Sequence, residues 1–125
     1  SGIPPVFAKS NKAKPILVFA CAADKDPAGF APIFYGNIAH LYLTVPGSFK
    51  KGNLEKTVAA FTQIFGNENS VVMEASEDFN AVLKKAFTQS IAENRPLLIT
   101  GSFYLAAEAQ RVYSAEGFQD RGTQG

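Results

Sequence analysis

Four short apolar runs alternate along the chain with segments in which apolar residues recur every three to four positions. The runs are rich in β-branched and aromatic residues, as strands covered on both faces are. They span residues 15–22, 40–45, 70–75 and 96–100. Strands that alternate with helices at this spacing predict right-handed βαβ units. We therefore expect an α/β fold, with a mainly parallel sheet and helices on both faces, as in a Rossmann-like three-layer sandwich.

The segments between the runs predict the helices. Pro27 suits a first helical turn, although Gly29 and Pro32 make this helix short or irregular. Asn53 can cap a second helix, which Gly66 would end. The apolar face of that second helix comprises Leu54, Val58, Phe61 and Phe65.

The last two predicted helices have polar residues where a helix begins. Ser76 is predicted to cap one of them, with Glu77 and Asp78 in a first turn where carboxylates complement the helix dipole. Ser102 is predicted to cap the other, which Gly117 would end. Their apolar stripes comprise Phe79, Val82, Leu83, Ala86 and Phe87 in the first, and Leu105, Ala109, Val112 and Tyr113 in the second.

Composition narrows the class of protein. In 125 residues, 46% hydrophobic and 18% charged side chains are typical of one globular domain. We expect a lead-in segment over residues 1–14, the domain over 15–117 and a loose tail over 118–125. The formal net charge of +1 gives no argument for nucleic acid or a membrane as a partner. Cys21, the only cysteine, excludes a disulfide framework within the chain and favours a reducing cytoplasm.

One polar corner follows the last apolar run, at the edge where the carboxyl ends of parallel strands meet and ligands bind. Four corners are expected along that edge: residues 24–26, 44–47, 76–77 and 100–102. In the last of them, Gly101 lets the backbone turn sharply and lets a ligand approach closely. The hydroxyl of Ser102 and the amides behind it can form a small anion site for a carboxylate or phosphate. Alternatively, Ser102 only caps its own helix, which contributes about 1 kcal/mol without a ligand.

The corner after the first run has a lysine between two carboxylates. Asp24 and Asp26 can position a cation, whereas Lys25 can reach a bound anion as a compact point charge. Alternatively, this is a solvated loop in which Asp24 or Asp26 caps the helix that follows. An edge shared with Ser102 favours the binding interpretation.

Other chemistry has less support. The stretch GSFKKGN, residues 47–53, lacks the Lys-Ser/Thr pair that follows the second glycine of a phosphate loop, and no GxGxxG motif follows a strand. Cys21 has no neighbouring Arg or His to activate it, so we expect a buried thiol. His40 is expected to be structural, and one histidine with one cysteine cannot build a Cys/His zinc site.

Two stretches together resemble a known family. They are ILVFACAADKDPAGFAPIFYGNIAHLYLT, with its lysine-aspartate turn, and LLITGSFYLAAE, with its Gly-Ser-x-Tyr-Leu motif. Over residues 15–113 the order and spacing of these elements resemble the C-terminal domain of folylpolyglutamate synthase and dihydrofolate synthase. That domain belongs to the wider group of muramyl-peptide ligases.

The resemblance implies an ATP-dependent ligase of folate and one-carbon metabolism that adds glutamate to folate. In this family MgATP activates the folate carboxylate. The MgATP is bound mainly by a separate N-terminal ATPase domain. The C-terminal domain helps to hold the nucleotide and the incoming amino acid. By similarity, the substrate-binding residues are Lys25, Gly101 and Ser102, and the candidates at the nucleotide edge are Asp24, Asp26 and Thr100.

The chain also departs from the family. The family's C-terminal domain opens with a strand and an Asp-Gly-Ala-His-Asn-Pro segment, and the N-terminal residues SGIPPVFAKSN do not match it. The resemblance therefore implies a fragment that is inactive alone, with an open sheet edge at which two copies could pair. The alternative is a free-standing α/β module that binds a small anion or another protein without catalysis.

Overall fold

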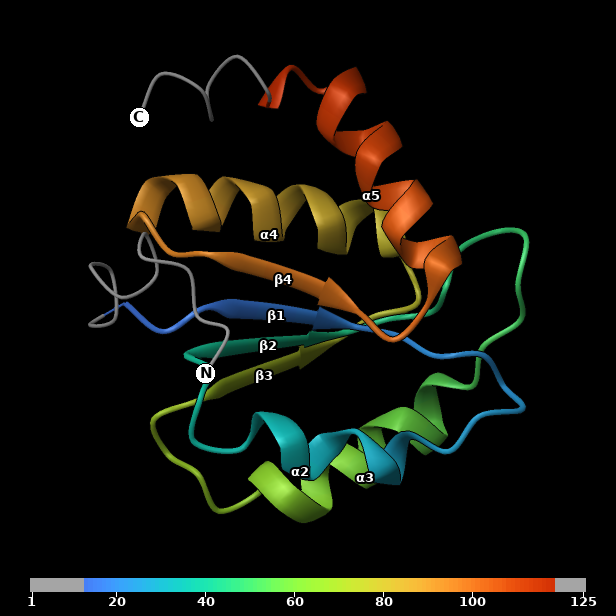
Figure 1. The fold of residues 1–125 in the computed structure, drawn as a ribbon, viewed down its shortest axis with the longest axis vertical. Coiled ribbons are helices and arrows are strands. Elements are labelled where there is room, and N and C mark those ends of the chain that lie inside the picture. The colour runs from blue at the N-terminus through green and yellow to red at the C-terminus, as the bar shows by residue number, and fades with distance from the viewer. Residues whose placement is uncertain (1–12, 119–125) are drawn as a thin grey trace.

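A single parallel sheet forms the centre of the protein. The computed structural model describes residues 13–118, and within that range no helix is long and apolar enough to cross a membrane. The four strands are β1 (Ile16–Phe19), β2 (His40–Leu43), β3 (Val72–Ala75) and β4 (Leu97–Thr100). They pair in the order β3-β2-β1-β4, every pair parallel (Figure 1). Each strand lies within the run that predicts it, so the expected α/β class and parallel sheet are confirmed.

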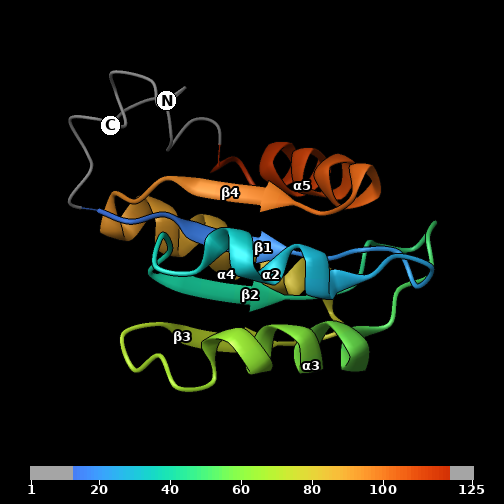
Figure 2. The ribbon, with the colours of Figure 1, turned by 60° about the horizontal axis from the view of Figure 1, so that its bottom comes forward.

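Helices cover both faces of this sheet, as Figure 2 shows. One face carries η1 (Pro27–Gly29), α2 (Ala31–Phe34) and α3 (Leu54–Phe65), and the other carries α4 (Phe79–Glu93) and α5 (Phe103–Ala115). The first predicted helix is indeed short and irregular, because it consists of the 3-10 turn η1 and the single α-helical turn α2.

The core is divided by the sheet into two apolar clusters. Side chains along β1 alternate between them, since successive residues of a strand point to opposite faces. Val18 packs with Tyr42 beneath α4 and α5, whereas Phe19 packs on the other face against Phe61 of α3. All four residues of β1 are fully buried, as expected of the strand at the centre of a doubly covered parallel sheet.

Helix caps follow the sequence with one exception. Asn53 and Ser102 cap α3 and α5 through their side-chain oxygens, as predicted. The prediction for Ser76 is wrong, because α4 begins later and its cap is Asp78, whose carboxylate accepts from the amide of Ala81 at 3.0 Å. The hydroxyl of Ser76 instead accepts from the amide of Asp78 at 3.1 Å, so Glu77 and Asp78 precede the first turn rather than lying in it. Of these two capping residues, which are two positions apart, the one that directly precedes the apolar stripe caps the helix.

The end of the described chain is packed. Phe118, which the sequence interpretation assigns to a loose tail, is only 3% exposed and belongs to the cluster beneath α4 and α5. Its ring lies 5.3 Å from that of Phe87. The rest of the expected tail, and residues 1–12 of the expected lead-in, lie outside the described residues.

Candidate functional site

A cavity opens at the carboxyl ends of β1 and β4. These strands are neighbours, but the chain leaves β1 toward η1 and α2 on one face and leaves β4 toward α5 on the other (Figures 1 and 2). Strands whose connections diverge in this way leave a crevice between them, which is where open α/β sheets bind ligands. Here the crevice holds a cavity of about 610 Å³, which we call the switch cavity. Its lining includes Lys25, Phe30, Lys50, Gly101, Ser102 and Phe103.

Lys25 reaches the switch cavity from the turn after β1. The amide of Lys25 donates to the carbonyl of Ala22 at 3.0 Å, which closes the turn. The carbonyl of Lys25 accepts from Nζ of Lys56 at 3.0 Å, which ties the turn to α3. The ammonium group of Lys25 itself has no hydrogen bond or ion pair with any residue of the described range. Its backbone is therefore held while its charge remains available to a ligand.

Lys50 provides a second cation that the sequence interpretation did not identify. It lies in the loop between β2 and α3, which folds back onto the end of β1. The amide of Ala23 donates to the carbonyl of Lys51 at 2.9 Å, and Ala22 bridges to Gly52. Like Lys25, the Lys50 side chain has no polar partner among residues 13–118. The only signal in the sequence was the stretch GSFKKGN, considered there solely as a phosphate loop.

Gly101 and Ser102 lie where predicted, but their local roles are now specific. The φ of Gly101 is +100°, and an added Cβ would lie 2.1 Å from the carbonyl oxygen of Ala20. The close approach that this glycine permits is therefore made by the end of β1, not by a ligand. Ser102 caps α5 by accepting from the amide of Tyr104 at 3.1 Å, as the alternative interpretation expected. Its hydroxyl retains a hydrogen that it can donate to a group in the cavity.

The other predicted edge residues divide into two groups. Thr100 lines the switch cavity. Asp26 caps η1 by accepting from the amide of Ala28 at 3.0 Å, and neither Asp26 nor the exposed Asp24 is among the lining residues. The corner at 76–77 follows β3, two strands from β1, and is not brought to the cavity. The structure thus unites the corners after β1 and β4 but not all four.

Exposed aromatic rings accompany the cations at the same edge. Phe103, at the start of α5, is 94% exposed and lines the cavity together with Tyr104, which is 47% exposed. Phe49, adjacent to Lys50, is 85% exposed. Exposed apolar side chains that gather in one place, unlike single ones, are typical of interaction sites. The edge therefore combines positive charge with apolar area.

The thiol of Cys21 is close to this edge but is not part of the lining. Cys21 is only 3% exposed, and burial raises the pKa of its thiol. A thiol that is held protonated is a poor nucleophile. This confirms the prediction of a buried thiol.

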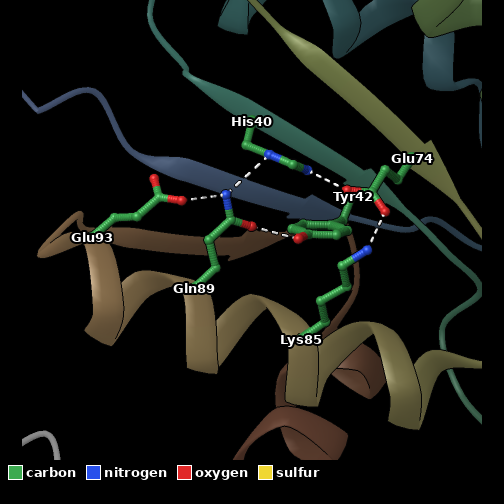
Figure 3. Close-up of polar contacts among 6 residues, drawn as sticks. All are labelled: His40, Tyr42, Glu74, Lys85, Gln89 and Glu93. Atoms are coloured by element: carbon green, nitrogen blue, oxygen red, sulfur yellow. Dashed lines mark hydrogen bonds and ion pairs between the residues drawn. The ribbon is translucent and has the colours of Figure 1, made fainter.

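A second polar cluster lies toward the amino ends of β2 and β3, on the α4 face (Figure 3). This cluster, the amino-end network, comprises His40, Tyr42, Glu74, Lys85, Gln89 and Glu93. Glu74 accepts from Lys85 and contacts His40 at 2.7 Å. These contacts lower the pKa of the Glu74 carboxyl, with the Lys85 hydrogen bond as the largest cause. No local pattern indicates this cluster, because its members lie far apart along the chain.

No family model, no curated protein and no solved structure matches this chain. Within residues 13–118, no group of three or more His, Cys, Asp and Glu side chains is placed to hold a metal ion.

Proposed function

We propose that this chain is the C-terminal domain of an ATP-dependent ligase of the folylpolyglutamate synthase type, and that its switch cavity holds the incoming glutamate. One observation carries the proposal. Lys25 and Lys50, two cations without polar partners in the described range, line one cavity with the N-terminus of α5 at the switch point of the sheet. The resemblance in sequence involves the same two corners.

The lining suits a small dicarboxylate. Each ammonium group can form a charge-assisted hydrogen bond with a carboxylate, and the hydroxyl of Ser102 can donate a further one. The amides at the start of α5 add the positive end of its dipole. Two carboxylates held in this way would orient the amino group of glutamate toward a second substrate, which is the positioning that amide formation needs.

The rest of the reaction requires a second domain. When bound, MgATP supplies the phosphoryl group that activates the folate carboxylate, and the proposal assigns its binding mainly to an N-terminal ATPase domain. The exposed rings of Phe49, Phe103 and Tyr104 suit an edge that closes against such a domain. Thr100, in the lining, remains the candidate of this chain for the nucleotide edge.

The alternative function is a module that binds a small anion without catalysis. It rests on the same cations and Ser102 hydroxyl in the lining, and it needs no second domain. The coding sequence upstream of Ser1 separates the two. A phosphate loop followed by an Asp-Gly-Ala-His segment supports the ligase, whereas a start codon close to Ser1 supports the module.

Binding by the purified chain tests the site itself. Titration calorimetry with glutamate should show that Lys25→Ala and Lys50→Ala each weaken binding roughly ten- to hundredfold, because a charge-assisted hydrogen bond contributes roughly 1.5–3 kcal/mol. Lys51→Ala is the matched control, since it removes the same charge from the neighbouring residue, which is not in the lining. Equal losses in all three variants, or no binding of glutamate, phosphate or nucleotide by the parent chain, contradict the assigned site.

A further inference from the structure

The amino-end network fixes the protonation state of the only histidine. Nε2 of His40 lies 2.7 Å from Oε2 of Glu74, and Nδ1 lies 3.1 Å from Nε2 of Gln89 (Figure 3). An amide nitrogen only donates, so Nδ1 must accept and carry no hydrogen. Nε2 therefore carries the hydrogen and donates it to Glu74. In this arrangement the imidazole is neutral.

Two further contacts determine which way the Gln89 amide points. Its nitrogen also donates to Oε2 of Glu93 at 2.9 Å, and its oxygen accepts from the hydroxyl of Tyr42 at 2.5 Å. A carboxylate requires a donor, so the nitrogen must face Glu93. Tyr42 is the donor in this contact, because an amide oxygen only accepts, and burial raises the pKa of the Tyr42 hydroxyl to about 12. Both hydrogens and the oxygen of the Gln89 side-chain amide thus have hydrogen-bond partners.

A proton added to His40 does not fit this arrangement. The new hydrogen on Nδ1 would point at the hydrogens of the Gln89 amide, and the His40 side chain is only 12% exposed, so water cannot readily take over the contact. A half-turn of the amide would present its oxygen to Nδ1 instead. The same half-turn would leave the buried Tyr42 hydroxyl without its acceptor and place the amide oxygen against the Glu93 carboxylate.

We infer that protonation of His40 is coupled to a half-turn of the Gln89 amide, which takes the acceptor from the Tyr42 hydroxyl, detaches Glu93 and makes the network a proton-sensitive latch on the end of α4. The titratable and charged groups that face the ring come from every neighbouring element. They are Tyr42 on β2, stacked on the imidazole with centroids 4.4 Å apart, Glu74 on β3, Lys85 and Glu93 on α4, and Arg95 after it.

The latch connects α4 to the entry of the central strand. Glu93 is the last residue of α4, and its second oxygen accepts from Nε of Arg95 at 2.8 Å. Nη1 of Arg95 donates to the carbonyl of Lys14 at 3.0 Å, two residues before β1 begins. Release of Glu93 is therefore transmitted to the segment that leads into β1.

A titration of the parent chain followed by NMR tests the coupling directly. Because the chain has a single histidine, its imidazole signals need no assignment among alternatives. Between pH 8 and 5, the side-chain NH₂ signals of Gln89 and the ring signals of Tyr42 should shift with the same midpoint as His40. Hydrogen exchange at the amides of Asn94 and Arg95 should accelerate over the same interval. If His40 titrates while Gln89 and Tyr42 do not change, the inference is wrong.

A variant pair measures the role of the amide. Gln89→Glu supplies acceptors to both the protonated imidazole and Tyr42, so the proton affinity of His40 should rise about tenfold. Gln63→Glu adds the same charge to an exposed position of α3 on the opposite face and should change that affinity less than twofold. Equal changes in the two variants overturn the assigned coupling. If Gln89→Glu does not fold, the titration of the parent chain still tests the coupling.

Discussion

The two ends of the sheet differ in whether their polar side chains have hydrogen-bond partners. At the carboxyl end, Lys25 and Lys50 line the switch cavity with no polar partner among the described residues. At the amino end, His40 and its neighbours engage one another in a closed set of hydrogen bonds. An anion in the switch cavity, as proposed, would give these two cations a counter-charge. The side chains of the amino end already have their partners within the described chain.

The largest expected effect is a loss of stability when the backbone at the carboxyl end of the sheet is disturbed. Gly101→Ala places a Cβ 2.1 Å from the carbonyl oxygen of Ala20 at a φ that other residues rarely adopt. We expect the free energy of unfolding to fall by about 3 kcal/mol or more in urea denaturation. Gly36→Ala is the matched control, because Gly36 also has a positive φ but its Cβ would meet nothing within 4 Å. It should lose only about 1–2 kcal/mol. If both variants lose a similar free energy of unfolding, the backbone of Gly101 does not pack closely against the carbonyl of Ala20.

An intermediate effect separates capping from binding at Ser102. Ser102→Ala and Asp78→Ala each remove a helix cap, and each should lower the free energy of unfolding by about 1 kcal/mol. Only Ser102→Ala should also weaken glutamate binding, by roughly three- to tenfold, because it alone removes a donor from the cavity. In an intact ligase the same change should impair the use of glutamate more than that of ATP. Unchanged glutamate binding by Ser102→Ala would reduce Ser102 to a cap.

The smallest effect concerns the amino end and its pH dependence. The pKa of Glu74 is lowered in the folded chain, chiefly by the hydrogen bond from Lys85. A folded-state pKa below the unfolded one stabilises the fold above the unfolded pKa, and this stabilisation is lost as pH falls through the folded pKa. Lys85→Met should therefore cost about 0.5 kcal/mol at pH 7 and almost nothing at pH 2–3, as measured by denaturation.

Lys84→Met provides the comparison for Lys85. Lys84 is the adjacent residue of α4, and it pairs with Glu116 at 3.5 Å instead of with Glu74. Its replacement should leave the Glu74 contribution between pH 7 and pH 2–3 intact. If the two variants lose the same stability over that range, the lysine contact with Glu74 does not control its titration.

Local signals in the sequence were sufficient for the fold. Apolar runs located every strand, and Asn53 and Ser102 were identified as caps because capping depends on residues two or three positions away. The prediction that Ser76 caps α4 was wrong for a local reason too, because Asp78, two residues later, is the cap. Within the candidate site, Lys25 and Ser102 could be paired from topology alone, because both follow strands of one parallel sheet.

The remaining parts depended on contacts between distant segments. Lys50 reaches the cavity only because the β2–α3 loop pairs with the end of β1, and no periodicity encodes that contact. Gly101 was correctly placed, but the atom that it avoids belongs to Ala20 at the other end of the chain. The amino-end network joins His40 to Gln89, which lie 49 positions apart in the sequence. Such side-chain arrangements follow from packing and not from local pattern.

The central position of β1 also constrains the order in which the protein can form during synthesis. β1 is made before the other three strands of this sheet, yet one of its two neighbours, β4, is the last of the four to be made. Until β4 arrives, one side of a fully buried apolar strand has no partner, which exposes the nascent chain to misassociation. The switch cavity is therefore completed only after β4 and the start of α5 have been translated. A nascent or truncated product that ends before α5 should be a substrate for chaperones and proteases rather than a weaker binder.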